Sequence, residues 1–496
     1  MIVRSPRGVD ASRALCALAV AGALSALAAC ATNPVTGKRE LVLISEQQEI
    51  AMGQQSAAEV EQSIGLVPDS ALQNYVQRVG IGLARASQRP NLPWQFRVVK
   101  DATPNAFALP GGYIFVTRGL MGLMTSEAEL ATVLGHEIGH VTARHQVRSL
   151  TRAELAQAGL AVGSMLSQTI ARYGQLASSG LQLLFLKYSR GDEAQADELG
   201  FGYAYRARYD VGEMGDVFAT LDRYVGKQTA GKGSGLPSWL ETHPSGPDRV
   251  AAVNRRLAAL GDSARGLVVR RNEYLHRLDN LAYGDDPRDG FFQGSRFVHP
   301  DLRFQISFPQ GWKTQNQPES VVGASPNQDA VMELTLDTIA PAAQAMRALA
   351  SGQGIQVADA ANQTLNGVPA VTGVFQAQTQ QGVVTGIAEF LDYGGHTYRI
   401  LAYTPSQAFT SYRPSMEQAA RSFAPLTDPA LLAVQPRRIR LVSADRRMTL
   451  ADFNTRFPST IGLDELAIIN QLPDGSAFVS AGTLVKRVLG TGVPGT

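Results

Sequence analysis

The feature that most constrains this 496-residue chain is the motif His-Glu-Ile-Gly-His at residues 136–140. Ser126, followed three residues later by Glu129, is typical of a helix start, and apolar residues then recur at helical spacing through the motif. Histidines four residues apart lie one turn apart on the same helix face, so both rings can reach one metal ion. Glu137 projects beside them and can take a proton from a water molecule. The motif therefore predicts a hydrolytic metal site on a helix.

The composition limits what else can hold the metal. The chain has two cysteines, Cys16 and Cys30, and both lie in its first thirty residues. A disulfide framework, a redox pair or a thiolate zinc site is therefore excluded from the rest of the chain, and the ligands must be nitrogen and oxygen. Lys and Arg number 45 against 43 Asp and Glu, a balance that argues against nucleic acid as a partner.

A hydrolytic zinc site usually has three protein ligands and an open fourth position. His145 lies five residues after His140, about 140° further round a continuous helix, so it is expected to miss the metal. Glu193 and Asp197 are four residues apart at the start of another predicted helix. One of them can ligate the metal while the other orients a ligand histidine through its ring N–H. A solvated acidic pair is the alternative for this spacing.

The N-terminus is typical of an export signal. Three arginines precede an uncharged run, residues 14–29, which is shorter than the roughly 20 residues of a membrane-spanning helix. Leu-Ala-Ala-Cys at 27–30 resembles the lipobox of bacterial lipoproteins. That resemblance implies cleavage before Cys30, lipidation of Cys30 and a membrane anchor. Ala31, in place of an aspartate, favours the periplasmic face of the outer membrane; a soluble periplasmic protein is the alternative.

A strand pair is predicted ahead of the active helix. Residues 107–116 are two apolar runs around a Pro-Gly-Gly turn. An edge strand here could bind an extended peptide by β-pairing, which makes four residues candidates for substrate binding. These are Phe107, Ala108, Leu109 and Tyr113. An ordinary sheet hairpin is the alternative.

Three motifs in order carry a family resemblance: residues 136–140, Glu-Ala-Gln-Ala-Asp at 193–197, and Thr-His-Pro at 242–244 with Arg249 after it. The set resembles the membrane-associated zinc metalloproteases that include the CAAX prenyl protease and HtpX. It looks closest to the periplasmic BepA-type members. The resemblance covers about residues 33–260.

The resemblance implies one zinc ion per chain and a role for each motif residue. The implied ligands are His136, His140 and Glu193. Asp197 would support a ligand histidine. His243 would lie at the site, either as a fourth ligand that silences the enzyme or as a stabiliser of the oxyanion. Arg249 would be a local structural partner.

The C-terminal half departs from BepA-type proteins, because their tandem helical repeats are not visible. Alternating residues after 300 predict an α+β domain instead. The last segment, 438–489, resembles a degenerate LysM module, and such modules bind peptidoglycan glycans. A plain stabilising subdomain is the alternative for this segment.

The predicted fold class is therefore α+β and multidomain. A mainly helical zincin-type domain with a small sheet precedes an α+β domain and a small βααβ module. The predicted division is signal peptide 1–29, tether 30–45, metalloprotease domain 46–283, linker 284–300, α+β domain 301–428, linker 429–437, LysM-like module 438–489 and tail 490–496.

The leading functional hypothesis is a zinc-dependent endopeptidase of the bacterial envelope that cleaves misfolded or stalled envelope proteins. Its partners would be unfolded protein substrates, a membrane through the lipid anchor, and peptidoglycan. One alternative is a zinc-stabilised, non-enzymatic scaffold that holds peptidoglycan or an outer-membrane complex. Another is a chaperone with latent protease activity. The intact Glu137 favours an enzyme over a scaffold, because a scaffold needs ligands but no base.

Overall fold

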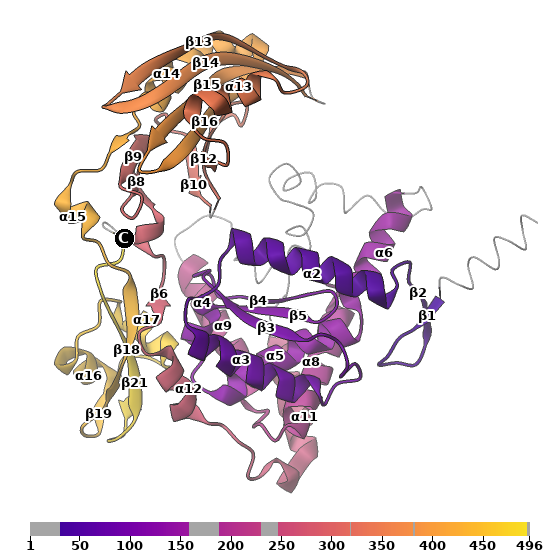
Figure 1. Ribbon diagram of the computed structural model, residues 1–496. Coiled ribbons are helices and arrows are strands. Elements are labelled where there is room, and N and C mark those ends of the chain that lie inside the picture. Colours follow the sequence, from indigo (N-terminus) through magenta and orange to yellow (C-terminus); the bar gives the residue numbers. More distant parts are fainter. Residues whose placement is uncertain (1–29, 158–187, 230–246, 318, 380–381, 494–496) are drawn as a thin grey trace, which may run out of the picture. The chain divides into compact units, whose positions relative to one another are not determined.

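The computed structural model describes residues 30–157, 188–229, 247–317, 319–379 and 382–493 (Figure 1). The chain forms two compact units. The first unit contains residues 1–281 and 440–487, and the second contains residues 282–439 and 488–496. The second unit is thus inserted into the sequence of the first. The predicted signal peptide, 1–29, lies outside the described residues.

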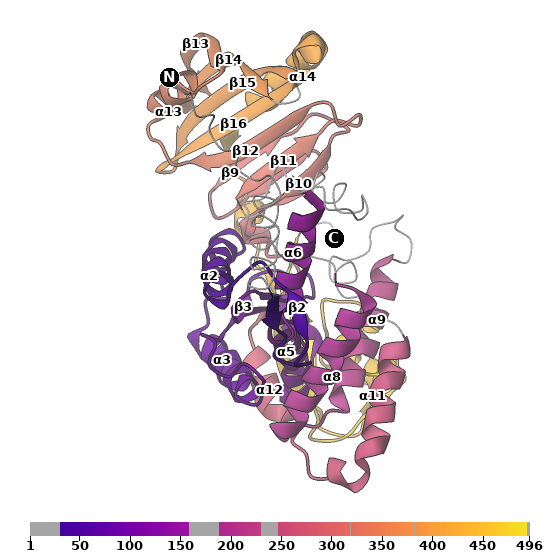
Figure 2. The same cartoon turned by 90° about the vertical axis from the view of Figure 1, so that its right-hand side faces the viewer.

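Helices dominate the first unit. They are α2 Glu46–Ser63, α3 Ser70–Ala84, α4 Arg118–Leu123, α5 Glu127–Thr142, α6 His145–Gln157, α8 Arg190–Arg206, α9 Glu213–Thr229, α11 Pro247–Leu260 and α12 Arg271–Leu278. Helices α8 and α9 pack against α5, and α11 packs against α9 (Figure 2). Among the described residues, no helix combines the length and apolar character needed to cross a membrane.

The helix that carries the histidine motif begins where the sequence predicts. The Ser126 hydroxyl caps α5 by accepting a hydrogen bond from the backbone N–H of Glu129 at 3.1 Å. The Glu129 carboxylate accepts from the Thr125 N–H, one residue before the position that a capping box would use. The cap fixes the first turn of α5, and with it the direction in which the motif side chains project.

A three-stranded sheet lies beside α5, in the order β3 (Gln95–Val99), β5 (Tyr113–Thr117), β4 (Ala106–Leu109). Strand β4 is antiparallel to β5 and forms one edge, so the predicted hairpin is present. Its turn needs glycine: Gly111 has φ +78°, and a Cβ there would lie 2.6 Å from the Ile50 Cα. The turn therefore seats the hairpin directly against α2.

Residues 30–45 differ from the predicted tether. Strand β1 (Cys30–Thr32) pairs with β2 (Arg39–Leu41), and the chain then packs Val42 and Ile44 against Val147 in a small buried cluster. These apolar contacts, together with hydrogen bonds such as that from the Leu43 N–H to Thr151, hold the segment on the domain.

The C-terminal part of the first unit has the predicted order of strand, helix, helix and strand. Its elements are β18 Arg437–Ser443, β19 Met448–Thr449, α16 Leu450–Arg456, α17 Leu463–Ile469, β20 Phe478–Val479 and β21 Leu484–Leu489. Lys486 on β21 is fully buried, and its ammonium donates to the carbonyls of Gly122 and Met124, both at 2.8 Å. The segment therefore packs against the end of α4, just before α5 begins. Its likeness to a LysM module stays a prediction.

The second unit is built on two antiparallel sheets. The larger has the order β10-β11-β12-β16-β15-β14-β13 and the smaller has the order β17-β9-β8-β7. The strands are β6 Ala282–Tyr283, β7 Phe291–Gln293, β8 Arg296–His299, β9 Phe304–Ser307, β10 Lys313–Asn316, β11 Ser320–Ala324, β12 Val331–Asp337, β13 Ile355–Leu365, β14 Val368–Thr379, β15 Gly382–Tyr393, β16 His396–Pro405 and β17 Ala424–Pro425; the helices are α13 Ala342–Ala350, α14 Phe409–Ala420 and α15 Pro429–Leu432.

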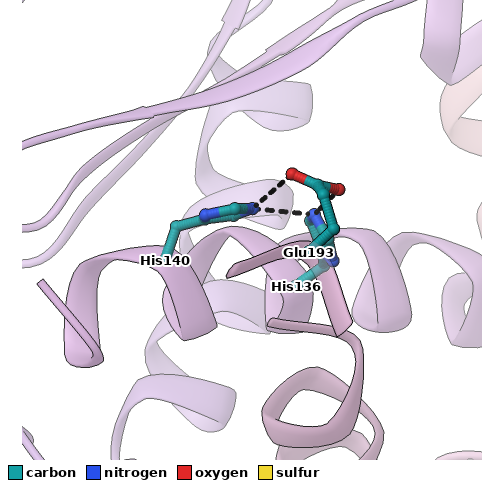
Figure 3. Close-up of side chains that lie close together, drawn as sticks. All are labelled: His136, His140 and Glu193. Atoms are coloured by element: carbon teal, nitrogen blue, oxygen red, sulfur yellow. Dashed lines mark hydrogen bonds and ion pairs between the residues drawn. The ribbon is translucent and has the colours of Figure 1, made fainter. Parts of the chain in front are cut away.

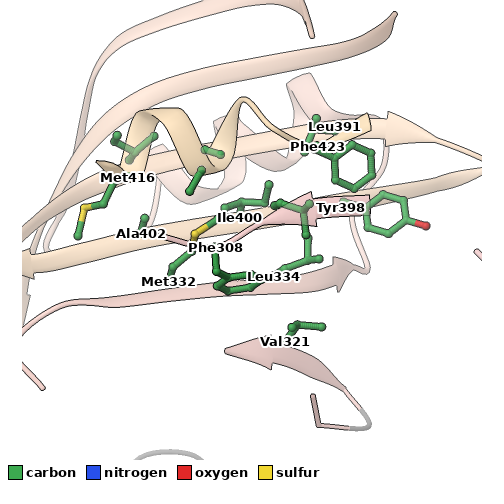
Figure 4. Close-up of a cluster of buried hydrophobic side chains, with 14 of the residues drawn as sticks. Phe308, Val321, Met332, Leu334, Leu391, Tyr398, Ile400, Ala402, Met416 and Phe423 are labelled. Carbon is green, nitrogen blue, oxygen red and sulfur yellow. The ribbon is translucent and has the colours of Figure 1, made fainter. Parts of the chain in front are cut away.

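The two faces of the larger sheet carry different helices. On β15, Ile387 and Leu391 belong to a core shared with α14 (Figure 4), whereas Ala388 and Phe390 belong to a core shared with α13. Residues 284–300, predicted as a linker, contain β7 and β8. Phe291 and Val298 of these strands are buried in a cluster with Leu426, Leu431 and Val434.

Candidate metal centre

Three buried side chains meet between α5 and α8. His136 and His140 project from one face of α5, and Glu193 projects from the first turn of α8 (Figure 3). The two Nε2 atoms are 3.0 Å apart. The Glu193 carboxylate lies 3.6 Å from His136 Nε2 and 3.4 Å from His140 Nε2. One nitrogen of each ring and one carboxylate oxygen thus converge on a common point.

The donor set fits zinc. Ligand atoms placed tetrahedrally about 2.0–2.1 Å from a zinc ion lie about 3.3 Å from one another, close to the three separations seen here. Burial lowers the pKa of His140 well below its ordinary value, so the ring is neutral and keeps a lone pair for a metal. In the described part of the chain, these three residues are the set of His, Cys, Asp and Glu side chains with metal-binding geometry.

The centre exists because α5 and α8 approach unusually closely. Cβ atoms built on Gly135 or Gly139 would lie 2.9–3.0 Å from the backbone of α8, and one built on Gly200 would lie 2.6 Å from the His136 nitrogen. Such distances leave no room for side chains at the crossing. The small residues therefore bring Glu193 within reach of both histidines.

Asp197, one turn after Glu193, holds His136 from behind. Its Oδ1 lies 2.9 Å from His136 Nδ1, and the Arg249 guanidinium donates to both of its oxygens at 2.8 and 2.6 Å. Burial alone would raise the pKa of Asp197, but the hydrogen bonds from His136 and Arg249 lower it to about 2. Asp197 is therefore ionised at neutral pH, and accepts the Nδ1–H that leaves Nε2 free for a metal.

Glu137 follows His136 on α5 and is only 2% exposed. It lines a cavity of about 30 Å³ together with His136, Arg249 and Ala106 from the edge strand β4. A space of that size can hold a water molecule. A carboxylate, a water-sized cavity and the metal-facing face of His136 are thus adjacent.

His145 has a place that the sequence analysis does not predict. Helix α5 ends at Thr142, and the turn to α6 brings His145 Nδ1 within 2.9 Å of His140 Nδ1. With Nε2 of His140 facing the centre, its Nδ1–H donates to His145, whose Nε2–H donates to Gln195 at 3.0 Å. The Tyr188 ring stacks on His140, with centroids 4.0 Å apart. His145 does not join the metal-facing set; it supports one of its members.

The remaining predicted residues are placed as follows. Phe107, Leu109 and Tyr113 are buried in a cluster that includes Val60 of α2, and Ala108 is also buried. Cys30 lies in β1. His243 lies outside the described residues, so its predicted place at the site stays a prediction.

Part of the chain that contains this site matches a known protein family. Residues 70–257 match the model of peptidase family M48. The predicted resemblance is confirmed. The M48 segment, as we call residues 70–257, contains α5, α8 and the whole metal-facing set, and it is of metallopeptidase type. It includes neither residues 282–439 nor 440–487.

Curated relatives agree with this assignment. The mitochondrial metalloendopeptidase OMA1 of Schizosaccharomyces pombe is 31% identical over 234 residues, which are 45% of this chain and 65% of that protein. A putative beta-barrel assembly-enhancing protease of Vibrio cholerae is 30% identical over 220 residues, 42% of this chain and 44% of that protein. The Yersinia pestis protein named beta-barrel assembly-enhancing protease is 29% identical over 45% of this chain and 46% of its own length. The chain thus spans less than two thirds of each.

Proposed function

We propose that this chain is a zinc-dependent endopeptidase of the bacterial cell envelope, with one zinc ion held by His136, His140 and Glu193. The observation that carries the proposal is the convergence of these three buried side chains beside Glu137. A metal-binding scaffold would need the first three residues but not a buried carboxylate at a water-sized cavity.

The residues divide the work of peptide hydrolysis. A zinc ion bound at the three ligands supplies Lewis acidity, which acidifies the attacking water and polarises the scissile carbonyl. Glu137 takes the proton of that water and delivers it to the leaving amine. Asp197, held by Arg249, fixes the ring of His136. His243 either silences the site as a fourth ligand or donates a hydrogen bond to the oxyanion.

Extended polypeptides are the proposed substrates. Strand β4 is an edge strand, and its first residue, Ala106, lines the cavity beside Glu137. Phe107 and Leu109 are buried against the core, so substrate would pair with the backbone of the strand. Only unfolded or misfolded segments can pair this way, which suits removal of misfolded or stalled envelope proteins. The names of the bacterial relatives, which refer to beta-barrel assembly, support that setting.

The proposed location follows from Cys30. Lipidation of this residue would anchor the chain at the periplasmic face of the outer membrane, and the LysM-like segment would bind peptidoglycan. A non-enzymatic or latent envelope chaperone is the second candidate, and a silencing His243 would favour it.

The test is zinc content measured together with casein cleavage, for the wild type and the Glu137→Gln and His243→Ala variants. We expect one zinc per chain in each variant, cleavage lost in Glu137→Gln, and cleavage raised in His243→Ala if that residue silences the site. Glu198→Gln, an exposed carboxylate on the same helix as Glu193, is the matched control and should behave as wild type. Zinc without cleavage in any variant would favour the scaffold; absence of zinc would refute the site.

A further inference from the structure

A carboxylate occupies a core position in the second unit. Along β15, Ile387 and Leu391 point into the core shared with α14, and Glu389, midway between them in sequence, lies on the same face of the strand. The side chain is fully buried. An apolar residue would suit this position better, because burying a carboxyl costs free energy unless its oxygens are satisfied.

The surrounding residues form a hydrogen bond to only one of the two carboxylate oxygens of Glu389. Thr372, its register partner on β14, donates a hydrogen bond to Oε2 at 3.2 Å, and Gln363 on β13 in turn contacts the Thr372 hydroxyl. The other oxygen, Oε1, has no hydrogen-bond partner among the described residues. Gln363, Thr372 and Glu389 thus form a polar stripe across three neighbouring strands. On the other side of β15, the register partner of Glu389 is the apolar Ile400, so the stripe ends at Glu389. The stripe thus runs from the sheet edge inward to one half-satisfied carboxyl.

A cavity lies over this stripe. Its volume is about 170 Å³, and Glu389 and Thr372 line it on the sheet side. Helix α14 contributes Ala420, whose small side chain leaves the space open, and Asp359 lies at a register irregularity in the edge strand β13. A buried cavity of roughly 150 Å³ can hold a benzene-sized molecule, so this one is larger than a single water requires.

The charged side chains that line the cavity favour a cation as its ligand. Its ionisable lining residues are Asp359, Glu389, Glu417, Arg413 and Arg421. With Glu389 ionised, three carboxylates face two guanidiniums, and Arg413 already pairs with Glu417 at 2.8 Å. A monovalent cation balances the set, an anion worsens the imbalance, and no lining residue in the described chain is aromatic, as a typical sugar site would require.

We propose that this cavity binds the ammonium group of a small organic amine, with Oε1 of Glu389 as the acceptor at its inner end. The ammonium would complete the hydrogen bonding of a buried carboxylate and neutralise its charge. The hydrocarbon part would lie along Val374 and Ala420 toward the mouth. The site is independent of the proposed zinc centre, since all its residues belong to the second unit.

The experiment is calorimetric titration of the purified chain with n-butylamine at pH 8, with 1-butanol and butyrate as size-matched probes. We expect saturable binding of the amine alone. Glu389→Gln keeps the shape and removes the charge, so it should weaken binding about tenfold or more. Glu333→Gln removes a carboxylate from the same sheet on the face opposite Met332 and Leu334, and should leave binding unchanged.

A second variant guards against loss of folding in the first. Ala361 is exposed on β13 at the cavity lining, so Ala361→Phe can obstruct the cavity without touching the core. It should abolish amine binding while Glu389 remains. Equal binding of 1-butanol, equal weakening by Glu333→Gln, or binding unaffected by both Glu389→Gln and Ala361→Phe would overturn the proposal, as would no saturable binding of the amine.

Discussion

Arg144 adopts a left-handed conformation, with φ at +57°, and separates α5 from α6. If α5 continued past this residue, as the sequence analysis assumed, the side chain of His145 would point away from His140. Because the helix breaks at Arg144, His145 lies within hydrogen-bonding distance of His140 instead. The spacing of the histidines predicts their common face because it depends only on helix geometry. The position of His145 depends on the φ angle of Arg144, which no residue pattern in the chain predicts.

His145 gives the first prediction. His145→Ala should weaken zinc binding about 10–100-fold, because the loss of a residue that orients a ligand typically has this effect. Competition with a chromogenic chelator measures the affinity. His276→Ala, at an exposed histidine on α12, is the control and should leave affinity unchanged. Equal zinc affinity in both variants would show that His145 does not position His140.

Glu389 gives a prediction about pH. Burial raises its pKa from 4.5 to about 7, while the Thr372 hydrogen bond and Arg421 oppose the shift. The folded state therefore holds this proton between pH 4.5 and 7, where the unfolded state has lost it. Its stabilising effect is complete below pH 4.5 and is lost as pH rises through 7. Relative to Glu389→Gln, the wild type should lose on the order of 3 kcal/mol across this window. Urea unfolding of both proteins at several pH values measures the difference; a constant difference would contradict the shift.

At the scale of elements, the α5–α8 crossing is what turns separate motifs into one centre. The sequence carries a signal for it, since Gly135 and Gly139 are four residues apart, as are Ala196 and Gly200. Small residues at this spacing allow close helix contact, but the pairing of two particular helices requires the tertiary fold. Hence Glu193 could be proposed as a metal ligand from the family resemblance and not from helix geometry alone.

Gly200→Ala tests the crossing. The added methyl group would lie 2.6 Å from the His136 nitrogen, so the helices must separate. We expect a loss of about 1–3 kcal/mol in stability and weaker zinc binding. Gly202→Ala on the same helix meets only the end of the Arg206 side chain and should raise stability by about 0.5–1 kcal/mol. Thermal unfolding and chelator competition measure both effects. Unchanged zinc affinity in Gly200→Ala would show that the crossing tolerates separation.

Sequence patterns predicted the elements that carry local signals and missed those that do not. Helix α5 and the β4–β5 hairpin follow from caps, periodicity and a glycine turn. Residues 30–45 and 284–300 resembled connections because their strands have only three or four residues and no comparable signal. Such strands form through pairing with distant partners, and a local pattern contains no information about those partners.

At the scale of the whole molecule, the first unit is discontinuous in sequence. Several contacts join its C-terminal part to the M48 segment, among them the buried Lys486 and the partly exposed Lys227, which pairs with Glu465 at 2.9 Å. Burial lowers the pKa of Lys486 to about 7, and Glu129 nearby opposes that shift. The sequence predicted residues 438–489 as a separate module, because its pattern shows neither the burial of Lys486 nor the pairing of Lys227 with Glu465.

The two lysines should differ in energetic weight. Lys486→Met leaves the carbonyls of Gly122 and Met124 unsatisfied and Glu129 without its cation, and should cost about 3–5 kcal/mol. Lys227→Met removes a partly exposed pair and should cost about 1 kcal/mol. Chemical unfolding followed by zinc release measures both. Equal effects would mean that the interior tie adds nothing to the stability of the M48 segment.

The discontinuity also bears on the order of synthesis. A ribosome completes every residue of the M48 segment before it reaches residue 440, and it adds the whole second unit in between. Throughout that interval the carbonyls of Gly122 and Met124, which precede α5, lack the lysine that donates hydrogen bonds to them. A nascent chain can therefore possess all of its metal-facing residues while its active helix is still incompletely anchored.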